Sequence, residues 1–162
     1  MKTRTPLNLP PAPLRLREDD DGYTRVFDPL RKKWIVLTPE EWVRQHFTSW
    51  LRSEFGYPAS LMANEKGVTV NGTKKRCDTV IFRNDGTPLV IVEYKAPDVS
   101  VTQAVFDQIV RYNMELHADY LIVSNGLNHY CCEIDYNNGG YRFFDKIPAY
   151  QELISRLKLT NG

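Results

Sequence analysis

The chain has 162 residues, a length that fits one domain with a proper hydrophobic core. Its formal net charge of +1 excludes a molecule that attracts nucleic acid over its whole surface, and no apolar run approaches the ~20 residues that cross a bilayer. The three cysteines fit neither a disulfide framework nor a zinc pattern, and the first residues lack the apolar core of a signal peptide. We therefore expect a cytoplasmic protein with buried thiols.

Residues 1–20 contain a proline-rich stretch followed by an acidic run. Proline lacks an amide donor and fixes its own torsion, so this segment cannot form a helix or a central strand. We expect an arm, either a tail that lies loosely on the surface or an interaction arm, followed by a single domain over residues 21–162. Two short strand-like runs around Asp28-Pro29, within residues 23–37, predict a hairpin or an irregular edge.

The sequence TPEEWVRQHFTSWLRSEFG, which begins at Thr38, predicts a helix with a clear start. Thr38 is a natural N-cap, Pro39 suits the first helical position, and Glu41 completes a capping box. Glu40 falls on the apolar stripe of this helix, whereas Glu41 is offset from it. The stripe has helical spacing and consists of Val43, Phe47, Trp50 and Leu51.

Extended segments and two further helices follow along the chain. We expect strands at residues 60–70, 76–83 and 87–95, a helix at 100–117, strands at 118–126 and 129–136, the short run YRFF, and a helix near 149–157. Two strong hairpin signals separate the first three strands, namely Asn71-Gly72 and Asn84-Asp85-Gly86. This order of elements predicts an α/β fold with a mixed sheet.

The hairpin around Asp85-Gly86 has a consequence for two acids. If those two residues form a tight loop, Asn84 faces Thr87, and the register continues by counting along both strands. Asp78 then stands directly opposite Glu93 on one face of the sheet. Opposite residues have Cβ atoms about 4.5–5.5 Å apart, and like charges at that distance are destabilising.

A divalent cation between the two carboxylates would remove this conflict. Mg²⁺ commonly takes one or two carboxylates while it keeps several waters. Lys95 lies two residues beyond Glu93, so its side chain points to the same face. The alternative is that Asp78, Glu93 and Lys95 are solvated residues at strand ends whose spacing is coincidental.

The spacing of these residues resembles a known signature. Asp78, then fourteen residues, then Glu93-Tyr94-Lys95 is similar to the PD-(D/E)XK nuclease motif, with Cys77 where the family name has proline. Gln108 and Tyr112, in the run QIVRY, resemble the Q-x-x-x-Y motif of the RecB-like branch. The runs TPEEWVRQHF, EYKAPDV and YLIVSNG are similar to N-terminal domains of type I restriction enzyme R subunits, and the resemblance covers residues from about 34 to 135.

The resemblance implies a restriction-endonuclease-like fold and a set of site residues. Asp78 and Glu93 would ligate Mg²⁺, for which Mn²⁺ substitutes, with help from the backbone carbonyl of Tyr94. Lys95 would position or activate the attacking water. Three further side chains would support the site or contact DNA, namely Gln108, Tyr112 and an acid of the first helix, with Glu40 the first candidate and Glu41 the second.

The resemblance also implies a substrate and partners. We expect Mg²⁺-dependent hydrolysis of DNA phosphodiester bonds, as an endonuclease that works with helicase, methyltransferase or specificity subunits of a restriction system. Lys74, Lys75 and Arg76 precede Asp78 and are candidates for phosphate contacts, although a solvated hairpin end explains them equally well. The competing interpretations are a catalytically silent DNA-docking or assembly module and, more weakly, a structural protein.

Overall fold

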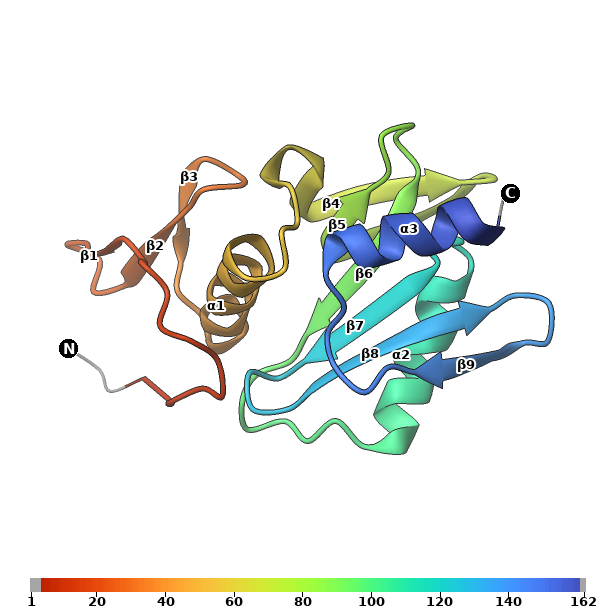
Figure 1. Cartoon of the computed structure of the whole chain (residues 1–162). Coiled ribbons are helices and arrows are strands. Elements are labelled where there is room, and N and C mark those ends of the chain that lie inside the picture. Colours follow the sequence, from red (N-terminus) through yellow and green to blue (C-terminus); the bar gives the residue numbers. More distant parts are fainter. Residues whose placement is uncertain (1–3, 161–162) are drawn as a thin grey trace.

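The computed structural model describes residues 4–160, which form two β-sheets and three α-helices (Figure 1). The first sheet is small and antiparallel, in the order β1-β2-β3, with strands Leu16–Glu18, Thr24–Asp28 and Lys33–Val36. The second sheet has six strands in the order β4-β5-β6-β7-β8-β9. Their bounds are Met62–Val70, Thr73–Phe82, Pro88–Tyr94, Tyr120–Ser124, His129–Asp135 and Gly140–Phe143.

Helices cover both faces of the six-stranded sheet (Figure 1). One core cluster joins α1 (Pro39–Ser53) and α3 (Tyr150–Thr160) to one face, and the other cluster joins α2 (Gln103–Met114) to the opposite face. Strands β6 and β7 are parallel and all other neighbours in this sheet are antiparallel. The predicted α/β fold with a mixed sheet is therefore confirmed, and it is of the restriction-endonuclease-like type.

Local chemistry explains where the helices begin. The Thr38 hydroxyl accepts a hydrogen bond from the Glu41 backbone N–H at 3.1 Å, and the Thr102 hydroxyl accepts one from Val105 at 3.3 Å. Each bond satisfies an amide that has no partner within its own helix. Helix α2 is shorter than the predicted segment 100–117, because the residues before Gln103 form a loop that returns from β6.

The hairpin between β5 and β6 differs from the predicted two-residue loop. Arg83, and not Asn84, faces Thr87, since the Arg83 N–H donates to the Thr87 carbonyl at 2.8 Å. Phe82 then pairs with Pro88, whereas Ile81 pairs with Val90, so Leu89 is an extra residue that forms a bulge. The longer loop and the bulge shift the register in opposite directions and cancel. Beyond the bulge the pairing is the predicted one, with Thr79 opposite Val92.

The N-terminal arm is not a loose tail over the residues that the structure describes. The Asn8 N–H donates to the Gly126 carbonyl at 2.8 Å, and the side chains of Leu7 and Leu9 pack against the core. Strand β1 pairs with β2, so the expected boundary at residue 20 falls inside a hairpin. The contact of Asn8 with the segment around Gly126 could not be predicted from the sequence, because the two segments lie more than 110 residues apart along the chain.

Two expectations about the interior and the membrane can be compared with the structure directly. Cys77, Cys131 and Cys132 are all buried free thiols, as expected. Between residues 4 and 160, no helix is long and apolar enough to span a bilayer.

Candidate active site

A pocket of about 400 Å³ opens where β5 and β6 meet α2. Five of the predicted site residues line it together, with one residue from the predicted basic segment and one apolar residue: Asp78, Glu93, Lys95, Gln108, Tyr112, Arg76 and Ile109. The strands supply the acids and the lysine, and the helix supplies Gln108 and Tyr112. Residues four apart share one face of a helix, which explains why both of these side chains reach the pocket. Their catalytic role stays a prediction.

The two acids lie against each other, Asp78 from the middle of β5 and Glu93 from the end of β6. The Tyr94 backbone N–H donates to Asp78 Oδ2 at 2.9 Å, which draws the Asp78 carboxylate to the residue that follows Glu93. Burial, the charge of Asp78 and a hydrogen bond with Asp78 raise the pKa of Glu93 to about 8. Lys95 and the Asn113 side chain act in the opposite direction but do not offset this effect. The raised pKa means that the pocket resists holding both acids in their ionised form, because the two carboxyl groups repel each other when both are charged.

A divalent cation between the two carboxylates would relieve their repulsion. Within residues 4–160, no group of three or more His, Cys, Asp and Glu side chains gathers in a way that could hold a metal. A cation here would therefore rest on Asp78, Glu93, backbone oxygen and water, and such a water-rich oxygen set is one that Mg²⁺ accepts. Oxygen donors of this kind fit Mg²⁺ or Mn²⁺, and metal ligation by the Tyr94 backbone carbonyl stays a prediction.

The opposite face of the same strands locks the acids in register. The Tyr94 and Thr79 hydroxyls are 2.9 Å apart, and Thr79 donates to Asn64 Oδ1 at 2.6 Å. Asn64 in turn donates to Asp28 Oδ2 at 3.0 Å. Thr79 and Tyr94 directly follow Asp78 and Glu93 in sequence, so this buried chain of hydrogen bonds holds the two strands together immediately behind the pocket.

Glu40 does not join the site, contrary to the first choice made from sequence. Its side chain is exposed, whereas Glu41 is only 4% exposed and accepts a hydrogen bond from Arg31 at 2.7 Å. The apolar stripe of α1 predicted that Glu40 would be the buried acid. The stripe does not show that Glu41 pairs with the buried arginines Arg31 and Arg44. Arg44, three residues after Glu41, lies 3.6 Å from it and donates to the Asp78 backbone carbonyl at 3.2 Å. Glu41 thus reaches the site only through Arg44.

The three basic residues before Asp78 have different surroundings. Arg76 lines the pocket, pairs with Glu65 at 2.8 Å and has a side chain that is 70% exposed. The Lys75 ammonium lies 4.0 Å from the centre of the Tyr112 ring, and Lys74 is exposed. A phosphate contact is therefore sterically open to Arg76 at the pocket opening, whereas the Lys75 side chain is only 16% exposed and lies 3.9 Å from Glu115.

Sequence reasoning missed two residues that touch the acids. Asn113 is 4% exposed on α2, donates to the Ile109 carbonyl at 2.9 Å and acts to lower the pKa of Glu93, while its Oδ1 has no partner among the described residues. A polar residue four positions after Ile109, on the buried stripe of α2, was the available signal. Arg44 had no signal of this kind, because its contact with Asp78 spans 34 residues.

Residues 39–148 match the family described as "Type I restriction enzyme R protein N terminus (HSDR_N)". The chain belongs to this family. The match covers well over half of the chain and includes every residue that lines the pocket. No curated protein matches the chain.

A solved structure shares the fold of this R-protein N-terminal domain. It is assigned as a fragment of an HsdR subunit of a type I restriction enzyme from Vibrio vulnificus YJ016, with 24% sequence identity and a TM-score of 0.53. The similarity covers 75% of this chain and 25% of that one. The resemblance to R subunits stated from sequence is thus confirmed for the family and the fold.

Proposed function

We propose that this R-protein N-terminal domain is a Mg²⁺-dependent PD-(D/E)XK nuclease that hydrolyses DNA phosphodiester bonds, as an endonuclease within a restriction system. The convergence of Asp78, Glu93 and Lys95 in one pocket is the observation that carries the proposal. The family assignment supports a role in restriction, and a cytoplasmic location with methyltransferase, specificity and helicase components as partners belongs to the same proposal.

Each residue has a distinct task in this proposal. Asp78 and Glu93 hold the cation, which when bound polarises a phosphoryl oxygen and lowers the pKa of a coordinated water. The Lys95 ammonium orients the attacking water and offsets negative charge that grows on the scissile phosphate. Gln108 and Tyr112 have donors that suit phosphate or sugar oxygens, and no side chain here is needed as a covalent nucleophile.

A nicking assay on supercoiled plasmid tests the proposal. Wild-type protein with Mg²⁺ or Mn²⁺ should convert the plasmid to open circles, and Lys95→Ala should lower the rate by at least about 100-fold, as loss of one charge-stabilising group does elsewhere. Glu40→Ala is the matched control, because Glu40 is exposed and does not line the pocket. Equal rates for wild type and Lys95→Ala would remove Lys95 from the mechanism.

The second candidate is a catalytically silent docking or assembly module. The net charge of +1 and the presence of only two pocket carboxylates favour it, because both predict weak binding of DNA and of metal. Titration calorimetry separates the two candidates. Binding of Mn²⁺ that disappears in Asp78→Ala supports the nuclease, and absence of binding in the wild type supports the module.

A further inference from the structure

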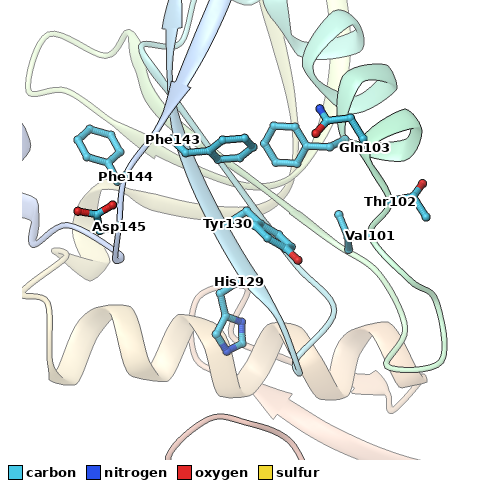
Figure 2. Close-up of a pocket in the computed structure, with 9 residues that line it drawn as sticks. Val101, Thr102, Gln103, His129, Tyr130, Phe143, Phe144 and Asp145 are labelled. Atoms are coloured by element: carbon cyan, nitrogen blue, oxygen red, sulfur yellow. The ribbon is translucent and has the colours of Figure 1, made fainter.

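A second cavity lies at the N-terminal end of α2, beside the outer strands β8 and β9. Its volume is about 450 Å³, within the range of small-molecule pockets. Phe106, Tyr130 and Phe143 form its aromatic wall, and they come from α2, β8 and the end of β9. Figure 2 shows the side chains of Tyr130 and Phe143. None of these residues belongs to the pocket of Asp78 and Glu93.

The aromatic wall is rigid at its base and open at its rim. Phe106 is 3% exposed and is part of the core, and its ring centre lies 5.0 Å from that of Phe143 and 6.1 Å from that of Tyr130. Phe143 and Tyr130 are themselves 46% and 36% exposed. Two aromatic faces are therefore held in place by a buried ring while they remain in contact with solvent.

Exposed apolar side chains gather around this cavity. Within the described part of the chain, seven large hydrophobic side chains are exposed, and two of them, Tyr130 and Phe143, line it. Val99 precedes the lining residue Val101 by two positions, and Leu127 precedes the lining residue His129 by two. Such a concentration of exposed apolar surface marks a binding site more often than chance.

Polar groups stand at the edges of the aromatic wall. Figure 2 shows Gln103 and Thr102 on one side of Tyr130 and Phe143, and Asp145 on the other. Asp145 is exposed and has no hydrogen bond or ion pair with any other residue in the described range 4–160. The Gln103 amide nitrogen donates to Asp107 and to the Tyr141 hydroxyl, so the Gln103 carbonyl oxygen and the Asp145 carboxylate are the groups left for a ligand. Acceptors beside flat aromatic faces match the amino groups on the edge of a nucleobase.

We propose that this cavity binds an unpaired nucleobase of a DNA strand, stacked on Phe143 and Tyr130. The inference rests on the proposed function, because it names DNA with unpaired nucleotides as the substrate class of the neighbouring pocket. Both pockets border α2 but on opposite flanks of it, this one beside β8 and β9 and the other beside β5 and β6. About three strand spacings of about 4.8 Å, roughly 14 Å, separate the two places, and four or five nucleotides cover that distance even at about 3.4 Å per nucleotide. A single strand that passes over α2 can therefore reach both sites.

Fluorescence anisotropy with the full chain in EDTA tests this site without any need for hydrolysis. The probe is a short fluorescein-labelled oligothymidylate at low salt, and the competitors are an abasic strand and a duplex of the same length. We expect Phe143→Ala and Tyr130→Ala to weaken binding by about 5- to 150-fold, the effect of losing one stacked base. Tyr23→Ala is the matched control, since Tyr23 is 58% exposed and lies in the turn between β1 and β2 of the small sheet.

Two further comparisons decide what the cavity recognises. Phe143→Leu keeps an apolar surface but removes the aromatic face, so it should weaken binding nearly as much as Phe143→Ala. The abasic strand keeps every phosphate, so it should compete poorly. Three outcomes would overturn the proposal: equal competition by the abasic strand, wild-type affinity in Phe143→Ala, or no binding by the wild type. The last outcome would leave a protein surface as the occupant of the cavity.

The same proteins separate this inference from the proposed nuclease activity. Oligothymidylate binding that depends on Phe143 together with a plasmid that stays intact would retain the base site and reject the nuclease. Plasmid nicking that depends on Lys95 together with no loss of binding in Phe143→Ala would do the reverse.

Discussion

Two pairs of acids lie on opposite sides of the six-stranded sheet, and their surroundings differ completely. The arginine-paired acids, Asp28 and Glu41, are 0% and 4% exposed, and both contact Arg31. Burial would raise the pKa of Asp28, but hydrogen bonds from Asn64 and Arg31 outweigh burial and lower the pKa. The pocket acids, Asp78 and Glu93, have no arginine between them, and the pKa of Glu93 rises to about 8.

The difference separates acids that stabilise a fold from acids that bind something else. A buried carboxylate that is matched by cations and donors within the protein has no capacity left for a ligand. A carboxylate pair that is left mutually repulsive costs stability, and such costs concentrate at functional sites. The pocket acids are therefore distinguished by the absence, within residues 4–160, of an arginine partner for their carboxylates. Of the arginine-paired acids, Asp28 supports the strands behind the pocket through its hydrogen bond from Asn64, which accepts from Thr79.

The largest expected effect is the loss of Arg31. Arg31→Met would leave Asp28 and Glu41 buried with one cation fewer, so the free energy of unfolding should fall by about 3–5 kcal/mol. Urea denaturation measures this loss. Arg142→Met is the control, because the Arg142 side chain is 79% exposed and its pair with Glu133 should contribute less than about 1 kcal/mol. A loss in Arg31→Met no larger than in the control would contradict the contrast between the two pairs.

An effect of intermediate size is expected on the free energy of unfolding as the pH is lowered. Because the pKa of Asp28 is lower in the folded state than in the unfolded chain, its contribution is fully present above about pH 4 and is lost as the pH falls through the folded value. The slope due to this one proton is at most about 1.4 kcal/mol per pH unit. Urea midpoints measured from about pH 5 downwards should show a shallower slope in Asp28→Asn, whereas Asp98→Asn at an exposed site should keep the wild-type slope. Parallel slopes for Asp28→Asn and wild type would remove Asp28 from the acid response.

The smallest effect is expected at the pocket, and its sign is the informative part. Glu93→Gln in EDTA relieves repulsion from Asp78, so the free energy of unfolding should stay unchanged or rise by up to about 1 kcal/mol. The same variant should lose the thermal stabilisation that saturating Mn²⁺ gives the wild type under the proposed function. A loss of more than about 2 kcal/mol in EDTA would place Glu93 with the arginine-paired acids as a structural residue.

Local patterns were sufficient for most elements and for part of the site. The N-cap of α1, the hairpin signal at Asn71-Gly72 and the continuous apolar run of β6 depend on residues that are close in sequence. The facing of Asp78 and Glu93 was also reached from local counting, but for an incomplete reason. The predicted loop was one residue too short, and the bulge at Leu89 corrected the register, so the correct pairing depended on two shifts that no local rule specified together.

What the sequence by itself determined is therefore the set of local decisions: which segments form helices and strands, which residues share a face, and that a hairpin brings two acids together. Only the tertiary structure decided how α1 is rotated against the sheet, which makes Glu41 and not Glu40 the buried acid, and which side chains from distant segments surround each cavity. The physical reason is that these choices minimise the burial of unpaired charge over the whole molecule. Contacts such as Arg44 with Asp78, or Asn8 with Gly126, join segments whose own residues carry no record of each other.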